Sequence, residues 1–115
     1  GVYITGGGIA RSTGVPDIGL ITLNEQIARV KMICEAVSVP VLADADTGYG
    51  KPLNVVRTVR EYERAGVAAI CIEDNVYPKR CSFYAGVRRE LIPIVEHCGK
   101  IKAAKAAKAA PAGKR

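Results

Sequence analysis

Apolar and polar residues alternate along the chain in two kinds of pattern. Three short, nearly continuous apolar runs, each bounded by glycine, proline or polar residues, cover residues 2–5, 39–46 and 67–74. Such runs are typical of strands that are buried on both faces of a parallel sheet. Between and after these runs, apolar residues recur at three- and four-residue spacing, which is the pattern of an amphipathic helix.

Three helices are predicted from this spacing and from their end signals. The helix over residues 22–37 opens with a T-x-x-E capping box. The helix over residues 52–66 has proline in its first turn and glycine at its end. A last helix is predicted over residues 88–110, where A-A-K repeats favour helix but offer no apolar face. Strands that alternate with helices predict right-handed βαβ units, so the fold class is α/β with a parallel sheet.

The net charge of +6 does not change this picture, because it belongs to the C-terminal tail. Residues 100–115 hold six of the 17 basic residues and no acidic residue, which leaves eleven basic and eleven acidic residues in the body. A solvated helix end is favoured over weak binding of a polyanion. We expect no specific nucleic-acid partner, and the chain has no apolar stretch of the length that a membrane span needs.

The four cysteines show no C-x-x-C pair, which predicts reduced thiols in a cytoplasmic protein, most of them buried. Cys81 differs from the others because Lys79 and Arg80 precede it. Neighbouring cations lower a thiol pKa and favour the reactive thiolate. Cys81 is therefore a candidate catalytic residue, with a structural role as the alternative, and the other three cysteines are interpreted as structural.

Acidic residues follow two of the predicted strands at their carboxyl ends. Asp44 and Asp46 point to one face of the second strand, and Glu73 ends the third. Asp17 lies in the loop after the first strand, on the same side. Ligands bind at this edge in α/β folds, so the acids predict a site for Mg²⁺, with Mn²⁺ as a second possibility. The alternative is that the acids cap helices or form ion pairs.

The glycine-rich turn after the first strand is a second candidate for binding. Thr5, Gly6 and Gly7 begin the stretch T-G-G-G, in which consecutive glycines let backbone N–H groups approach an anion. A turn that holds a carboxylate or phosphate is one interpretation. A tight bend between strand and loop is the other.

Four motifs carry a resemblance to a known family. The stretches YITGGG, GVPDIGL, VPVLADADTGYG and AGVAAICIEDNVYPKRC occur in the order and spacing of the isocitrate lyase and phosphoenolpyruvate mutase superfamily. They are most similar to the methylisocitrate lyase branch. The resemblance implies a (β/α)₈ TIM barrel, of which residues 1–104 would form about three consecutive βα units, followed by the basic tail 105–115. The chain is therefore expected to be a fragment, and full-length members are expected to form homo-oligomers, usually tetramers.

The resemblance also assigns roles to residues in the predicted site. The implied metal site is Asp44, Asp46 and Glu73; the implied substrate-binding residues are Thr5, Gly6, Gly7 and Asp17; the implied catalytic residues are Tyr3, Lys79, Arg80 and Cys81. Tyr3 would lie near the reacting hydroxyl, and Cys81 would protonate the product of carbon–carbon cleavage. One departure concerns the residues after Cys81, where Ser82 and Phe83 replace the glycine and histidine of the lyases.

The activity implied by the resemblance is a Mg²⁺-dependent carbon–carbon lyase. Its substrate would be a small 2-hydroxy acid of the 2-methylisocitrate type, cleaved to a 2-oxo acid (pyruvate) and a dicarboxylate (succinate). Alternatives within the superfamily are carboxyphosphonoenolpyruvate or phosphoenolpyruvate mutase chemistry and oxaloacetate decarboxylation. A third hypothesis is a non-catalytic barrel remnant that needs a partner chain.

Overall fold

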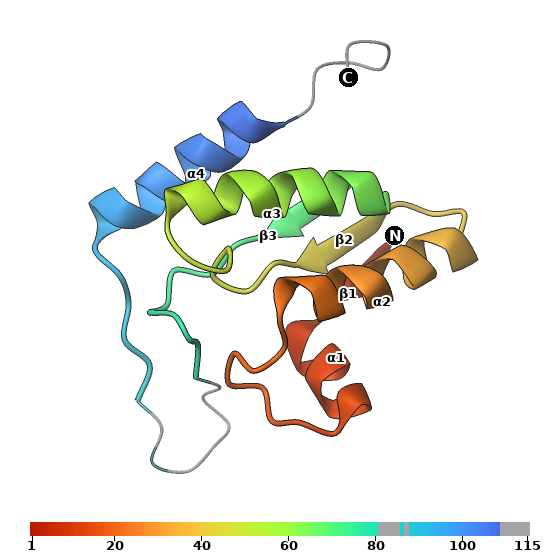
Figure 1. The fold of residues 1–115 in the computed structure, drawn as a ribbon, viewed down its shortest axis with the longest axis horizontal. Coiled ribbons are helices and arrows are strands. Elements are labelled where there is room, and N and C mark those ends of the chain that lie inside the picture. Colours follow the sequence, from red (N-terminus) through yellow and green to blue (C-terminus); the bar gives the residue numbers. More distant parts are fainter. Residues whose placement is uncertain (81–85, 87, 109–115) are drawn as a thin grey trace.

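The computed structural model describes residues 1–80, 86 and 88–108. Its centre is one parallel sheet of three strands in the order β1–β2–β3, formed by β1 (Val2–Ile4), β2 (Val41–Asp44) and β3 (Ala69–Cys71). The three strands point the same way and helices cover them from one side (Figure 1). The predicted α/β class and the alternation of parallel strands with helices are confirmed.

Only one face of the sheet is covered among the described residues, which corrects the expected burial of both faces. The register aligns Tyr3, Leu42 and Ala69 in one row across the strands. Tyr3 is 50% exposed and Leu42 38%, and Ala69 is also exposed. Because side chains alternate along a strand, the neighbouring residues face the opposite way and are the ones that form the core.

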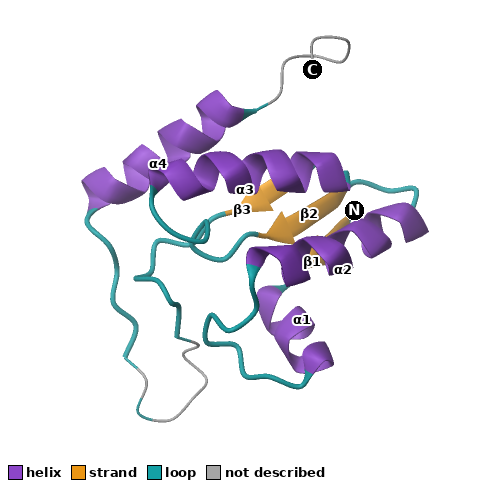
Figure 2. Ribbon diagram, in the orientation of Figure 1, coloured by secondary structure: helices purple, strands orange, loops and turns teal. Residues whose placement is uncertain are grey.

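The covered face packs against two helices, α2 (Leu23–Ala36) and α3 (Pro52–Ala65) (Figure 2). The predicted capping box at the start of α2 is present, with Thr22 and Glu25 bonded in both directions. Gly66 ends α3 in the left-handed conformation, with φ of 101°, as its sequence position predicts. The main core consists of Ile4, Ile9, Val30, Val41, Ala43, Ala45, Tyr62 and Ala65.

An additional helix, α1 (Gly6–Thr13), lies where the sequence predicted only a turn. Three consecutive glycines have low helix propensity, so the local sequence gives no helix signal. The helix forms because Thr5 caps it, accepting a hydrogen bond of 2.8 Å from the Gly8 amide. Burial of Ile9 and Ala10 in the core adds tertiary support.

The last helix, α4 (Ile94–Ala107), begins after Pro93 rather than near residue 88. It runs beside α3, on the side away from α2 (Figure 1). Ala104 and Ala107 pack against Val55 and Val59 of α3, so the A-A-K repeats do present a narrow apolar face, contrary to expectation. No helix in the described ranges has the length and apolar content needed to cross a membrane.

The cysteines of the described chain are less buried than the sequence suggested. Cys34 is half-buried, whereas Cys71 and Cys98 are exposed. Cys71 is exposed because it lies on the uncovered face of the sheet, in register with Asp44. The expectation of mostly buried, structural thiols is therefore wrong for these two residues.

Candidate active site

The site is built on the turn that follows β2, residues 45–50. Its backbone enters the left-handed region at Asp46 (φ 52°), Gly48 (φ 86°) and Tyr49 (φ 60°). Two main-chain hydrogen bonds of 2.9 Å fix the turn, from the Ala45 amide to the Cys71 carbonyl and from the Gly48 amide to the Ala45 carbonyl. Such conformations are unfavourable for residues other than glycine, so the surrounding contacts must hold them.

Side chains from the outer helices supply these contacts by donating hydrogen bonds to carbonyl oxygens of the turn and of the strand end. The donors are Tyr62 to Asp44 (2.8 Å), Thr58 to Gly48 (2.9 Å) and Lys100 to Thr47 (2.9 Å). All three donor residues are buried. The turn and the strand end before it are thus held from α3 and α4.

Asp44 joins the end of β2 to the start of α1. Its Oδ2 accepts a hydrogen bond of 3.2 Å from the Gly6 amide, and its Oδ1 accepts one of 2.7 Å from the Asp46 amide. The residue is 7% exposed. A carboxylate at a helix N-terminus is favoured by the unpaired amides there, so part of the helix-capping alternative is confirmed for this residue.

The predicted glycine turn therefore receives an anion, and that anion is a carboxylate of the chain itself. A Cβ placed at Gly6 would lie 3.1 Å from Asp44 Oδ2, and one at Gly7 would lie 3.2 Å from Asp17 Oδ2. Glycine at these two positions lets both carboxylates approach the first turn of α1 closely. The structure brings Gly6, Gly7, Asp17 and Asp44 together.

Asp46 is the carboxylate with the most perturbed proton affinity. Burial raises its pKa to about 6, although the nearby Lys79 ammonium and a hydrogen bond from the Thr47 amide oppose the rise. The carboxylates of Glu73 and Asp44 raise the pKa further. Asp46 thus lies in a region where negative charge accumulates and where a cation would be stabilised.

Glu73 reaches the same region from the segment after β3. Its amide donates a hydrogen bond of 2.8 Å to the Asp46 carbonyl, which fixes the two segments side by side. Its Oε2 accepts a hydrogen bond of 2.9 Å from the Asn75 side chain and lies 3.7 Å from Arg89. The predicted convergence of Glu73 with the aspartates is therefore present at the carboxyl edge of the sheet.

Lys79 places a positive charge among these acids. Its side chain is buried, and its Nζ lies 3.2 Å from Asp17 Oδ1 and 3.8 Å from Glu73 Oε1. Burial opposes the charge, but the carboxylates of Asp46, Asp44, Glu73 and Asp17 outweigh that effect, and the pKa of Lys79 is raised. The ion-pair alternative for the acidic cluster is thus present in the structure, with Lys79 as the partner.

Tyr3 and Cys71 lie on the uncovered face beside the acids. Burial and then the charges of Asp44, Cys71 and Glu73 raise the pKa of Tyr3, so its phenol keeps its proton at neutral pH. Sequence reasoning included Tyr3 but missed Cys71 as a residue of this region. The alternation of strand side chains could have found it, because residues 69, 71 and 73 share one side up to the strand end.

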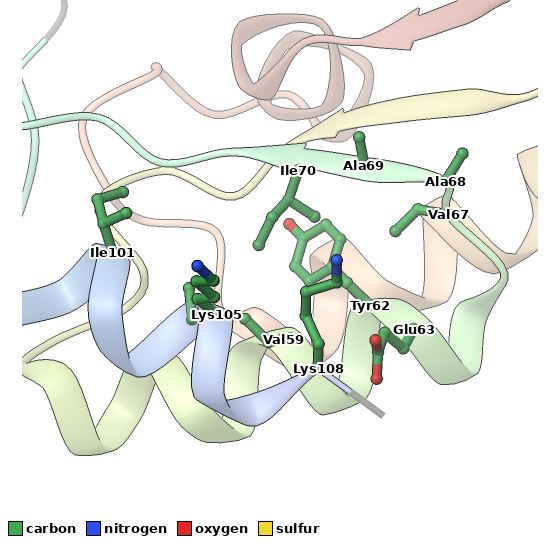
Figure 3. A pocket seen from close by; sticks show the side chains of 11 residues that line it. Val59, Tyr62, Glu63, Val67, Ala68, Ala69, Ile70, Ile101, Lys105 and Lys108 are labelled. Atoms are coloured by element: carbon green, nitrogen blue, oxygen red, sulfur yellow. The ribbon is translucent and has the colours of Figure 1, made fainter. Parts of the chain in front are cut away.

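Two of the predicted catalytic residues, Arg80 and Cys81, follow Lys79 in the chain. Arg80 is exposed and lines a separate groove of about 210 Å³ with Arg88 and Arg89. Cys81 lies outside the described residues. A larger, mainly apolar groove of about 340 Å³ runs between α3, β3 and α4 (Figure 3). The carboxylates of the acidic cluster, Asp17, Asp44, Asp46 and Glu73, do not line it.

The candidate metal ligands Asp44, Asp46 and Glu73 suit a hard divalent cation, because all of them offer carboxylate oxygens. Among the described residues, no group of three or more His, Cys, Asp or Glu side chains is arranged to hold a metal ion. Mg²⁺ is commonly held by one or two carboxylates, with water and substrate oxygens completing its shell. One or two of Asp44, Asp46 and Glu73 could hold the ion in that way.

Comparison with known proteins places these features in a family. Residues 1–113 match the family described as phosphoenolpyruvate phosphomutase. The chain is 56% identical over 104 residues to 2,3-dimethylmalate lyase of Eubacterium barkeri, covering 90% of this chain and 35% of that protein. It is 53% identical over 85 residues to 2-methylisocitrate lyase of Aeropyrum pernix, covering 74% of this chain and 28% of that protein. The chain thus spans about a third of the length of these relatives.

Solved structures agree with this match. Phosphoenolpyruvate phosphomutase from Streptomyces platensis subsp. rosaceus superposes with a TM-score of 0.86 at 45% identity, over 95% of this chain and 38% of that one. Phosphonopyruvate hydrolase in complex with oxalate and Mg²⁺ superposes with a TM-score of 0.78 at 38% identity, over 94% of this chain and 36% of that one. The three strands and their helices therefore match part of the TIM barrel of these structures.

Proposed function

The chain belongs to the phosphoenolpyruvate phosphomutase family, and from that premise we propose that it carries part of the active site of a Mg²⁺-dependent carbon–carbon lyase. The proposed substrates are branched 2-hydroxy acids of the 2-methylisocitrate and 2,3-dimethylmalate type. Two relatives named for lyases that act on such acids support the substrate class. The activity belongs to the whole protein, since this chain spans about a third of its relatives.

One observation carries the proposal, namely the convergence of Asp44, Asp46 and Glu73 at the carboxyl edge of the sheet. The hydrogen bond of 2.8 Å from the Glu73 amide to the Asp46 carbonyl and the bond from the Asp46 amide to Asp44 hold the three together. Mg²⁺ bound there would supply a positive charge that stabilises negative charge developing on a substrate oxygen.

Tyr3 and the first turn of α1 are proposed to orient the substrate. The phenol of Tyr3 remains protonated because its pKa is raised, so it can donate a hydrogen bond to the reacting oxygen. The substrate carboxylate is proposed to bind at Thr5, Gly6 and Gly7, where amides at a helix N-terminus favour an anion and where it would compete with the Asp44 carboxylate for the Gly6 amide. Asp17 pairs with Lys79 and lies beside Gly7 in this region.

The proposed reaction breaks the bond between the hydroxyl-bearing carbon and its neighbour. The hydroxyl proton is released to solvent water as that carbon becomes the carbonyl of the 2-oxo acid, and the electron pair of the broken bond goes to the neighbouring carbon. Cys81 is proposed to give its thiol proton to that carbon, which completes the second product. Arg80 precedes it in the chain and is proposed to favour the thiolate that remains.

The proposal is tested by binding and by turnover. Isothermal titration calorimetry of the chain with oxalate, with and without Mg²⁺, measures whether the ion and a small dicarboxylate bind together. Release of pyruvate from 2-methylisocitrate or 2,3-dimethylmalate is then followed in a protein of the relatives' full length that contains residues 1–108. Asp44→Asn and Glu73→Gln are expected to abolish both signals, whereas Lys31→Met, on the exposed side of α2, leaves them unchanged.

Either of two results would overturn this proposal. Mg²⁺ that fails to bind, or binds equally well to Asp44→Asn, would remove the metal site. A full-length protein that binds Mg²⁺ but releases no 2-oxo acid from either substrate would remove the lyase activity and favour the mutase or decarboxylase alternatives.

The uncovered sheet face favours a second candidate function, a barrel segment that acts only with another chain. Tyr3 and Leu42 are exposed on that face, and the outer edges of β1 and β3 have no strand partner among the described residues. Sedimentation of the purified chain over a concentration series tests it. Self-association is expected under this hypothesis, and a stable monomer that binds Mg²⁺ and oxalate would count against it.

A further inference from the structure

Lys79 is buried although it belongs to a surface segment. Its neighbours Val76, Tyr77, Pro78 and Arg80 are all exposed, whereas Lys79 is 4% exposed. The segment rests on the loop before α2 at Gly19, where a Cβ would lie 2.8 Å from the Pro78 side chain. The backbone therefore stays at the surface while one long side chain reaches inward.

The inner end of that side chain lies where a cation has the most carboxylates around it. Lys79 Nζ is 3.2 Å from Asp17 and 3.8 Å from Glu73. A Cβ built on Gly6 would lie 3.1 Å from Asp44 Oδ2 and 3.4 Å from Lys79 Nζ, so these two atoms border the same small space. The ammonium thus adjoins acids from the α1–α2 loop, from β2 and from the segment after β3.

The charges do not balance within this cluster. Four carboxylates (Asp17, Asp44, Asp46 and Glu73) face Lys79, and Arg89 adds a second positive charge 3.7 Å from Glu73. Buried like charges repel unless cations compensate them, so two cations among four carboxylates leave part of the negative charge uncompensated. A divalent cation would compensate it better, but the ammonium and the ion would compete for Asp44, Asp46 and Glu73.

We propose that Lys79 is an internal counter-cation, which holds the carboxylates together in the metal-free protein and leaves them when a divalent cation binds. The inference rests on the proposed function, because it concerns the same carboxylates. It adds a regulatory step, in which metal binding frees Lys79 and with it the segment 76–80. That segment leads directly to Cys81, so the order of events would be metal first and movement of this segment second.

The first test is the affinity for Mg²⁺ in a variant that lacks the competing charge. Lys79→Met keeps the length of the side chain and removes the ammonium, and it is expected to bind Mg²⁺ more tightly than the wild-type chain by roughly 5- to 150-fold. Lys31→Met removes one charge from an exposed position on α2 and is the matched control, with an unchanged dissociation constant. Calorimetry in the absence of any substrate gives these values without reference to activity.

The second test follows Lys79 itself in the wild-type chain, so it does not depend on the folding of a variant. Acetylation of lysine amines with an N-hydroxysuccinimide ester, read out by mass spectrometry, reports which ammonium groups are accessible. Lys79 is expected to be protected in metal-free protein and to become reactive at saturating Mg²⁺. Lys31 is expected to react equally in both conditions.

The outcomes separate this inference from the proposed function. Mg²⁺ binding with Lys79 still protected, or equal or weaker binding by a folded Lys79→Met protein, would overturn the counter-cation while leaving the metal site intact. Absence of Mg²⁺ binding in both the wild type and Lys79→Met would overturn the metal site and the counter-cation together. Tighter binding by the variant together with exposure of Lys79 supports both.

Discussion

The phenol of Tyr62 donates a hydrogen bond of 2.8 Å to the main-chain oxygen of Asp44. Tyr62 belongs to α3 and is fully buried, and Asp44 is the last residue of β2. Burial raises the pKa of the phenol, so it remains a donor over the whole physiological range. A helix that contributes no carboxylate to the acidic cluster thus fixes the backbone from which one of its carboxylates projects.

Tyr62→Phe is expected to destabilise the chain by about 1–3 kcal/mol, because the Asp44 carbonyl loses a buried donor. The aromatic ring remains, so the loss reports on the hydroxyl alone. Urea denaturation followed by circular dichroism measures the change, and Tyr77→Phe, at an exposed tyrosine, is the matched control. Equal stability of Tyr62→Phe and the wild type would show that this bond adds nothing.

Protonation of Asp46 is expected to compete with Mg²⁺. Its pKa is raised to about 6, so the carboxylate is ionised at neutral pH and is neutralised as the pH falls through that value. A protonated acid cannot ligate a cation, so affinity for Mg²⁺ should fall about tenfold for each pH unit below the transition. Calorimetry over a pH series measures this dependence.

The control for that prediction is Asp46→Asn, which cannot titrate. It should bind Mg²⁺ weakly at neutral pH and lose the part of the pH dependence that Asp46 causes. A wild-type affinity that stays constant between about pH 5 and about pH 7 would contradict the assignment of Asp46 to the metal site.

Gly48→Ala and Gly14→Ala separate the cost of a left-handed backbone conformation from the cost of steric crowding against a neighbouring side chain. Both glycines have positive φ, 86° and 81°. A Cβ at Gly14 meets nothing within 4 Å, whereas one at Gly48 would lie 2.5 Å from the Val55 side chain. We expect Gly14→Ala to cost about 1–2 kcal/mol and Gly48→Ala to cost about 1–3 kcal/mol more. Thermal unfolding measures both, and equal losses would contradict the crowding at Val55.

Lys100→Met tests a buried lysine that serves the turn after β2. Burial lowers the pKa of its ammonium, and the Glu96 carboxylate opposes this effect. The folded protein therefore loses this proton at a lower pH than the unfolded chain does. Between those two pKa values the unfolded chain binds more protons, so this group makes the free energy of unfolding rise with pH.

The free energy of unfolding of the wild type is expected to rise relative to that of Lys100→Met between about pH 7 and about pH 10. Urea denaturation across that range measures it. Lys102→Met, at an exposed position on the same helix, is the matched control. A pH-independent difference for Lys100→Met would contradict the lowered pKa.

The positions of the strands, of two helices and of the acidic edge could be predicted from local patterns. The helical spacing of apolar residues and the capping residues define α2 and α3. The alternation of side chains along a strand places Asp44 on the side of the sheet where Glu73 also lies. These features depend on residues that are close in sequence or on the general geometry of parallel sheets.

Features that depend on distant contacts could not be predicted in this way. Helix α1 contains three glycines and forms because Thr5, Asp44 and the core stabilise it. Lys100 lies beside repeats that suggest a solvated helix, yet its side chain is buried against Thr47. The ion pair of Lys79 with Asp17 joins segments 62 positions apart, and no local pattern selects that partner.

The hydrogen bond from Lys100 to the Thr47 carbonyl also orders events during synthesis of the chain. It joins residues 53 positions apart, and Lys100 belongs to the last described helix. At about 5–20 residues per second, a ribosome delivers Lys100 roughly 3 to 10 s after Thr47. During that interval the turn after β2 and the adjoining strand end are held from α3, through Thr58 and Tyr62, and the contact from α4 is added last.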